Sequence, residues 1–285
     1  MYTLLISVSQ LQALQARGAP LMVFDCSFDL ADPDRADALY AEQHIRGAVQ
    51  VHLNRDLSAH AAQDALNGGR HPLPNRELFG QTLRGLGFDN AMQAVVYDRN
   101  GVNYCGRLWW MLKWAGHDTV AVLDGGLQAW VAAGGAVQGG ADHPRPAGAF
   151  QLRPELRQWV DTSHVAARLG TPMQTVIDAR APERYRGEVE PFDPVAGHIP
   201  GALNRPFGSN LDADGRFKPA AQLRAEFEAL LAGRDPAGVV QHCGSGVSAV
   251  PNAIAMELAG YPPTSLYAGS WSEWCRTPGT PAERG

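Results

Sequence analysis

HIPGA at residues 198–202 repeats HIRGA at residues 44–48, and the match extends well beyond these motifs. In both copies the motif follows a short apolar run that ends in an aspartate, Asp25 in the first copy and Asp178 in the second. The two aspartates lie 153 residues apart and the first histidines of the two motifs 154, so the spacing inside the copies is nearly the same. Recurrence at one long period indicates that the chain contains the same domain twice.

The segments around these motifs predict the fold of each copy. Short apolar runs, such as 94–97 and 239–242, alternate with helical patterns, such as 108–114 and 253–258. This alternation is typical of an α/β fold in which helices flank a mainly parallel open sheet. A length of 285 residues also suits two domains of ordinary size.

A stretch rich in glycine and proline, at residues 134–146, separates the two copies and has the composition of a linker. We place the boundary near residue 148, which makes 1–148 the first domain and 149–285 the second. The first copy carries extra residues before its central strand, at about 58–74. We expect this insertion to lie in a surface loop, where added residues are tolerated.

The composition excludes several classes of function. Hydrophobic residues make up 45% of the chain, charged residues 19%, and the formal net charge is -5. We therefore expect a globular protein with no nucleic-acid and no membrane partner. Residues 1–8 lack the basic start of an export signal, so we expect a cytoplasmic location. The four cysteines form no Cys-x-x-Cys pair, which predicts free thiols and no metal site.

Cys243 stands where an open α/β sheet carries its chemistry, at the carboxyl end of a central strand. Gly244 and Gly246 follow it, and a helical pattern begins at about residues 248–252. Glycines allow loop N–H groups to turn inward as a nest for anions, and the helix N-terminus adds positive potential. These surroundings favour thiolate over thiol, which predicts a lowered pKa and a nucleophilic Cys243.

The first copy has Asp98 at the position of Cys243, so we expect the first domain to be catalytically inert. In the second copy, Ala249 stands where a cysteine phosphatase needs the arginine of Cys-x5-Arg. His242 should point to the opposite face of its strand, which leaves a cysteine hydrolase without its base. The loop suits one sulfur atom attached to Cys243 better than a phosphoryl group.

CGSGVSA at 243–249, the two HIxGA motifs and GSWSEW at 269–274 resemble the two-domain sulfurtransferases, which comprise the rhodaneses and the mercaptopyruvate sulfurtransferases. The resemblance covers about residues 7–276. It implies two tandem rhodanese-like domains and an enzyme in which a small-molecule donor leaves a sulfane sulfur on Cys243 as a persulfide. It also implies no metal or organic cofactor, and cyanide or a thiol such as reduced thioredoxin as the acceptor.

Within this family the residues after the cysteine indicate the donor. Thiosulfate-using rhodaneses place basic residues at the second and third loop positions, whereas mercaptopyruvate enzymes carry Gly-Ser, which matches Gly244 and Ser245. The resemblance therefore implies mercaptopyruvate as the preferred donor and thiosulfate as the alternative. It assigns donor binding in the loop to Gly244, Gly246, Val247 and Ser248.

RYRG at 184–187 matches the family segment that carries a substrate arginine, which implies that Arg184 binds the donor's carboxylate. Mercaptopyruvate enzymes usually have a second arginine nine residues later, where this chain has Asp193. The departure implies weaker binding of the carboxylate, or binding by Arg186 instead. The alternative is that both arginines are solvated loop charges.

The mercaptopyruvate enzymes also use a Ser-His-Asp relay that reaches across from the first domain. Ser245 matches its serine and His71 its histidine, while the aspartate position falls at Asn54, with Asp56 close by. The resemblance thus adds Ser245, His71 and Asp56 to Cys243 as catalytic candidates. The alternative is that His71 and Asp56 lie in an ordinary surface loop.

The competing class of function is a non-catalytic sulfur-binding or regulatory protein, and Cys243 in its glycine loop argues against it. His44 and His198 recur in both copies, including the one expected to be inert, so we expect them to be structural. The aromatic residues of the first copy's helices are expected in its core, namely Trp109, Trp110, Trp114 and Trp130.

Overall fold

The computed structural model describes all residues, 1–285, and divides into two compact units that are described here one at a time. The first unit holds a parallel five-stranded sheet in the order β1 (Leu5–Ile6), β6 (Val120–Leu123), β5 (Gln93–Tyr97), β2 (Leu21–Asp25) and β4 (Val49–Gln50). Its helices are α1 (Val8–Ala16), α2 (Arg35–Glu42), α3 (Leu53–Leu57), α4 (Arg76–Gly85), α5 (Cys105–Trp114) and α6 (Gly126–Ala132). A short antiparallel pair joins β3 (His44–Ile45) to β7 (Val137–Gln138).

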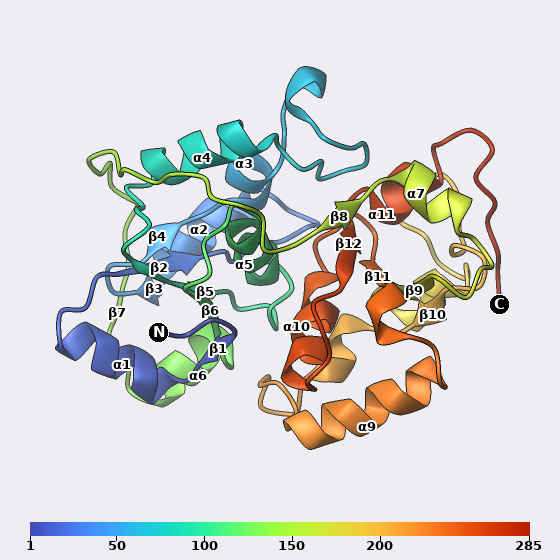
Figure 1. Cartoon of the computed structure of the whole chain (residues 1–285). Helices are drawn as coiled ribbons and strands as arrows, with labels where there is room; N and C mark the ends of the chain where they lie inside the picture. The colour runs from blue at the N-terminus through green and yellow to red at the C-terminus, as the bar shows by residue number, and fades with distance from the viewer. The chain divides into compact units, whose positions relative to one another are not determined.

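The second unit repeats this sheet (Figure 1). Its parallel strands have the order β8 (Trp159–Val160), β12 (Ser265–Tyr267), β11 (Val239–His242), β9 (Thr175–Asp178) and β10 (Leu203–Asn204). Its helices are α7 (Thr162–Ala167), α8 (Pro182–Tyr185), α9 (Ala220–Leu231), α10 (Val250–Leu258) and α11 (Ser270–Trp274). Strand for strand, both sheets have the same order, which confirms the predicted duplication and the α/β class.

Helices cover both faces of the first sheet because strand side chains alternate between the faces. Val95 and Tyr97 of β5 belong to the same buried cluster as residues of α1 and α6, while α5 contacts β5 and β6. The tryptophans expected in this core, Trp109, Trp110, Trp114 and Trp130, are all buried. No helix of either unit is both long enough and apolar enough to cross a bilayer.

The division between the units falls after Leu156 rather than at residue 148, and the units exchange two short segments. Residues 149–156 form no strand and are still hydrogen-bonded to the first unit. For example, the N–H of Leu156 donates to the carbonyl oxygen of Lys113 at 3.1 Å. Leu66–Leu73, part of the expected surface insertion, belongs to the second unit. There the N–H of Gly68 donates to Glu273 at 3.0 Å, so the segment is packed against α11.

The two motif histidines have matching surroundings. His44 stacks on Tyr40 and His198 on Tyr185, with ring centroids 3.8 Å apart in both pairs. Each Nδ1 lies 2.8 Å from the carbonyl oxygen of the tyrosine on which the ring stacks. Both histidines are buried, so they hold the chain after the second helix of one unit and after α8 of the other, as expected of structural residues.

Candidate active site

Cys243 directly follows β11, the central strand, which pairs with β9 on one side and β12 on the other. Its side chain is only 1% exposed. The loop after it leads into α10, which begins at Val250 with Pro251 in its first turn, and this confirms the predicted strand, loop and helix. Proline fits there because the first N–H groups of a helix need no intrahelical acceptor.

The two glycines of the loop have different reasons to be glycine. Gly246 has φ of +72°, and a Cβ there would overlap the carbonyl oxygen of Ala268. Gly244 has no left-handed φ. A Cβ on Gly244 would instead lie 2.7 Å from Nη2 of Arg70 and 3.5 Å from Nη1 of Arg184. Gly246 therefore shapes the turn, whereas Gly244 makes room for two guanidinium groups beside the cysteine.

Hydrogen bonds anchor the loop to α11 through its carbonyl groups. The carbonyl oxygens of Cys243 and Gly244 accept from the N–H groups of Trp271 and Ser272, at 3.0 and 2.9 Å. The N–H of Cys243 donates to Ser270 Oγ at 3.1 Å. By contrast, no hydrogen bond within the chain uses the N–H groups of Ser245 or of three donor-binding candidates, Gly244, Val247 and Ser248. These N–H groups remain available for a ligand.

The first unit indicates what such a loop binds. There Asp98 follows β5, and its carboxylate accepts hydrogen bonds of 2.9 to 3.0 Å from the N–H groups of Asn100, Val102, Tyr104 and Cys105. Gly101, at the position of Gly246, has a similar φ of +69°. The loop of one copy thus wraps a negative charge at the strand end, the place that Cys243 occupies in the other copy.

Ser245 and His71 lie together in the second unit, since Ser245 Oγ is 2.7 Å from His71 Nδ1. Both side chains are buried. The placement excludes an ordinary surface loop for His71. Asp56 lies in α3 of the first unit, where its carboxylate accepts from the N–H of His52 at 2.7 Å and burial raises its pKa. Its role in a relay stays a prediction.

The two arginines of RYRG have different surroundings. Arg184 is mostly buried, and its Nη2 donates to both oxygens of Glu190 at 2.7 and 2.9 Å. Arg186 is exposed and forms a two-point ion pair with Glu188, at 2.7 and 3.0 Å. Of the two, only Arg184 lies against the loop, beside Gly244.

Asp193, which stands where mercaptopyruvate enzymes usually have a second arginine, is buried among arginine side chains, and the weaker binding expected from it stays a prediction. Its side chain is fully buried and forms ion pairs with Arg70 at 2.5 Å, Arg276 at 2.7 Å and Arg184 at 3.8 Å. Sequence reasoning missed Arg70 as a site residue. Its position directly before His71 was the available signal, because a segment that delivers one side chain to a site also brings its neighbour near.

His242 is fully buried next to Cys243, and burial lowers its pKa to about 4. It is therefore neutral at pH 7, with Nε2 3.5 Å from a carboxylate oxygen of Asp178. Burial opposes the charge on Asp178, but Arg180, whose Nη2 lies 2.6 Å from a carboxylate oxygen, holds the pKa of Asp178 below the usual range. His242 thus belongs to the buried polar network of the strand ends, which agrees with its expected exclusion as a base for Cys243.

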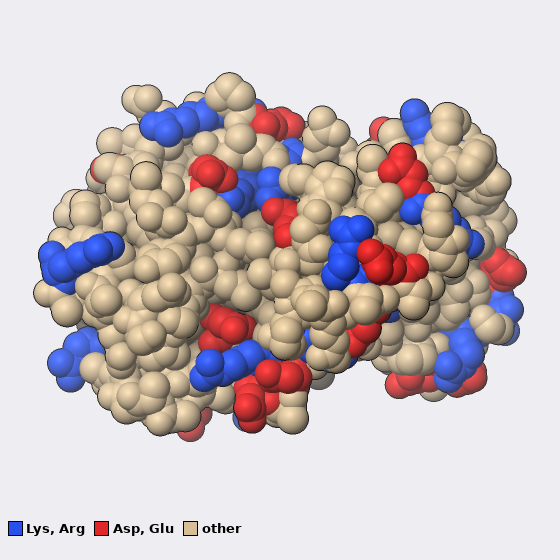
Figure 2. Space-filling view, turned by 60° about the horizontal axis from the view of Figure 1, so that its bottom comes forward, with Lys and Arg blue, Asp and Glu red and all other residues tan.

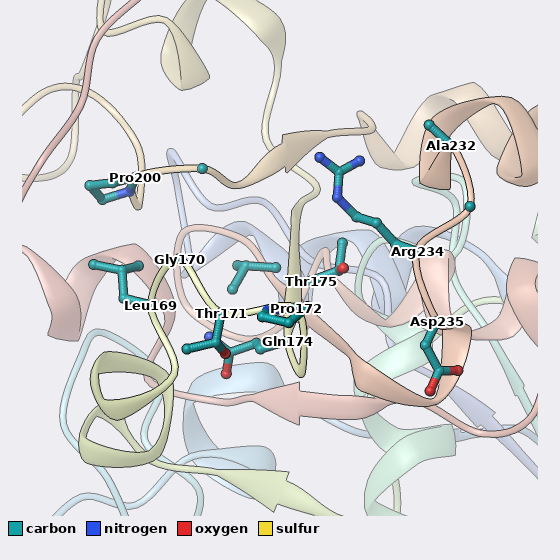
Figure 3. A pocket seen from close by; sticks show the side chains of 13 residues that line it. Leu169, Gly170, Thr171, Pro172, Gln174, Thr175, Pro200, Ala232, Arg234 and Asp235 are labelled. Atoms are coloured by element: carbon teal, nitrogen blue, oxygen red, sulfur yellow. The ribbon is translucent and has the colours of Figure 1, made fainter.

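A hollow of about 620 Å³ lies elsewhere in the second unit. Figure 3 shows Thr175, Pro200 and Arg234 around it. Thr175 is the first residue of β9, whereas Cys243 follows the last residue of β11, which is parallel to β9. The hollow and the cysteine loop are therefore at opposite edges of the sheet, and the hollow is not the site of Cys243 chemistry.

Comparisons with known proteins place the chain in a family. The rhodanese-like domain model matches residues 7–133 and 161–277. A Pseudomonas aeruginosa protein named a probable 3-mercaptopyruvate sulfurtransferase is 47% identical and covers 93% of both chains. Human 3-mercaptopyruvate sulfurtransferase is 33% identical, over 92% of this chain and 88% of its own. Mouse thiosulfate sulfurtransferase is also 33% identical, over 91% and 86%.

Solved structures agree with these relatives. The 3-mercaptopyruvate sulfurtransferase SseA of Escherichia coli aligns with a TM-score of 0.80 and 30% identity, over 95% of this chain and all of its own. Both copies of the fold are therefore matched, in sequence and in structure. The chain belongs to the two-domain sulfurtransferases of the rhodanese-like family.

Proposed function

We propose that this protein transfers sulfur from mercaptopyruvate through a persulfide on Cys243. The choice of donor rests on the hydrogen bond between Ser245 and His71. Ser245 lies in the loop, two residues after Cys243. A hydroxyl that is hydrogen-bonded to an imidazole can pass a proton to a leaving group. The two donors differ in whether they need that proton.

In the first half-reaction the Cys243 thiolate attacks the sulfur of mercaptopyruvate. A sulfur–sulfur bond forms and the carbon–sulfur bond breaks, so its electron pair remains on the former methylene carbon as the enolate of pyruvate. The free N–H groups of Gly244, Val247 and Ser248 stabilise the negative charge near the loop. The enolate then takes one proton and leaves as pyruvate.

That proton is assigned to Ser245, with His71 supplying it through the hydrogen bond of 2.7 Å. Thiosulfate, by contrast, releases sulfite, a stable anion that needs no proton in order to leave. A buried Ser-His pair beside the cysteine therefore has a task in mercaptopyruvate cleavage and none in thiosulfate cleavage. Asp56 is proposed as the relay's carboxylate.

In the second half-reaction the outer sulfur of the persulfide moves to cyanide or to a thiol, for which we propose reduced thioredoxin. The nucleophile attacks that sulfur, and the Cys243 thiolate leaves. The scheme needs no metal or organic cofactor. All four cysteines are free thiols, which favours the reducing cytoplasm as the location. Lysine and arginine are interspersed with aspartate and glutamate on the face in Figure 2, which favours a small-molecule donor over nucleic acid.

Thiosulfate:cyanide transfer is the second candidate, and one observation favours it. The loop itself has no basic residue, but Arg70 and Arg184 reach Gly244 from other segments. Two guanidinium groups suit a dianion such as thiosulfate as well as a carboxylate. The absence of charge in the loop therefore no longer separates the donors, and the Ser-His pair does.

The test compares donors in Ser245→Ala and His71→Ala variants. We expect kcat with mercaptopyruvate to fall about 100-fold or more, which is the usual effect of removing a general acid. Turnover of thiosulfate with cyanide should change little, because sulfite leaves without a proton. An equal loss with both donors would make the pair structural, and a wild type that prefers thiosulfate would reverse the assignment of the donor.

A further inference from the structure

We infer that Arg70 binds the donor's carboxylate together with Arg184, and that buried Asp193 is the positioning residue for Arg70. This inference rests on the proposed function and extends it to two residues. It also gives a reason why this chain has an aspartate at position 193, where mercaptopyruvate enzymes usually have an arginine. There the chain carries a carboxylate in place of a second arginine, and a guanidinium reaches the loop from the segment Leu66–Leu73 instead.

The position of Arg70 is defined on one side by Gly244. Its Nη2 lies 2.7 Å from where a Cβ on Gly244 would be, nearer than either terminal nitrogen of Arg184, at 3.5 and 3.6 Å. Both guanidinium groups also lie over the ring of Phe192, at 5.4 and 5.1 Å from its centroid. The guanidinium groups of Arg70 and Arg184 therefore lie on the same side of the site, which we call the wall, next to Gly244.

Arg70 has donors to spare for a ligand. Its Nη1 is bound to Asp193, but no hydrogen bond of the chain uses its Nη2 or its Nε, and Nε is buried. Nε and Nη2 form the side edge of the guanidinium, which matches the two oxygens of a carboxylate. Arg184 likewise has a buried Nε without a partner, while its Nη2 is held by Glu190.

The charges around this wall leave room for one anion. The ion-paired cluster contains three buried carboxylates, which belong to Asp178, Glu190 and Asp193. It contains four guanidinium groups, which belong to Arg70, Arg180, Arg184 and Arg276. One positive charge is in excess and offsets the charge of the Cys243 thiolate, so the donor's carboxylate is bound through the unpaired Nε donors of Arg70 and Arg184.

Asp193 can position Arg70 because it is held on both oxygens. Its Oδ1 pairs with Arg276 and its Oδ2 with Arg70, and no part of its side chain is exposed. A buried carboxylate with two partners has little freedom, so it holds Nη1 of Arg70 in one place. The Nη2 donors of Arg70 then face Gly244 before any ligand arrives, which reduces the ordering cost of binding.

The experiment uses the full chain and two thiol donors, mercaptopyruvate and mercaptoacetone, which lacks the carboxylate. We expect Arg70→Ala to raise KM for mercaptopyruvate roughly 10- to 100-fold, the value of a hydrogen-bonded charge, with kcat nearly kept. Asp193→Asn should raise the same KM. Neither change should alter kcat/KM for mercaptoacetone. Arg70→Lys should recover part of the loss, since it keeps the charge without the fork.

Arg224→Ala is the matched control, because Arg224 also pairs with a carboxylate, that of Glu228, but lies on α9 outside the cluster and its side chain is 45% exposed. It should leave KM for mercaptopyruvate nearly unchanged. Unchanged KM in Arg70→Ala, in a wild type that uses mercaptopyruvate, would overturn the role of Arg70 alone. Equal losses with both donors would make Arg70 structural and also overturn it. A wild type that cannot use mercaptopyruvate would overturn the proposed donor and this inference together.

Discussion

Cys243 differs from the two other buried cysteines in its surroundings rather than in its exposure. Cys26 and Cys105 are as buried as Cys243. Burial, reinforced by nearby aspartates, raises the pKa of both thiols well above the usual value, so they stay protonated and unreactive. Cys243 instead precedes a loop with free N–H groups and two neighbouring guanidinium groups. These surroundings are the basis on which we propose Cys243 as the nucleophile.

At the scale of the residue, we predict that Cys243→Ser abolishes sulfur transfer while leaving the fold intact, because the exchange is nearly isosteric. Mass spectrometry after incubation with mercaptopyruvate should show one added, cyanide-labile sulfur on the wild type and none on the variant.

The matched controls are Cys26→Ser, Cys105→Ser and Cys275→Ser, which should keep most of the activity. Turnover by Cys243→Ser above a small fraction of the wild-type rate would sink the assignment of the nucleophile.

At the scale of the element, the cysteine loop depends on one left-handed residue. Gly246 and Gly260 have similar φ values, +72° and +82°, but their surroundings differ. A Cβ at Gly246 would overlap Ala268, whereas a Cβ at Gly260, after α10, would meet nothing within 4 Å. The pair therefore separates the cost of the backbone conformation from the cost of crowding.

We predict that Gly260→Ala costs about 1 kcal/mol, the penalty of a left-handed residue with a side chain. Gly246→Ala should cost roughly 2–5 kcal/mol, since overpacking adds to that penalty. It should also impair sulfur transfer, because the loop must move away from Ala268. Urea unfolding of the full chain measures both costs. Equal destabilisation by the two substitutions would contradict the role given to Gly246.

At the scale of the whole molecule, the chain holds one fold twice with two different groups at the same strand end. In the first unit, the carboxylate of Asp98 satisfies four N–H groups of its own loop. The copy therefore needs no ligand there, which supports its proposed catalytic inertness. In the second unit, by contrast, no hydrogen bond within the chain uses the N–H groups of Gly244, Val247 and Ser248, to which we assign a part in the proposed chemistry at Cys243.

We predict that Asp98→Asn destabilises the first domain by roughly 2–4 kcal/mol, because one side of the amide cannot accept hydrogen bonds from N–H groups. Hydrogen exchange should quicken at the N–H groups of Val102, Tyr104 and Cys105. Persulfide formation at Cys243 should persist under conditions in which the variant stays folded.

Asp89→Asn is the control, since the half-buried Asp89 accepts from a single N–H, that of Ala91, in an exposed hydrogen bond. If both substitutions have the same effect on stability, the four bonds of Asp98 do not hold the loop.

The sequence alone determined the duplication, the parallel α/β sheets, the cysteine loop and the structural histidines. These features follow from local patterns, since apolar periodicity, glycine positions and a helix start are written in consecutive residues. The boundary between the domains could be predicted less exactly from the sequence. Residues 149–156 follow the linker-like stretch, but their hydrogen bonds join them to the first unit.

Only the tertiary structure decided which distant side chains meet. His71 and Arg70 lie in what reads as a surface insertion, yet they are brought to Ser245 and Gly244. From the sequence, position 193 shows only that an arginine usual in the family is missing. In the structure, Asp193 forms ion pairs with three other arginines. The physical reason is that an ion pair or a hydrogen bond depends on distance in space, and residues far apart in the chain carry no local pattern that records their partners.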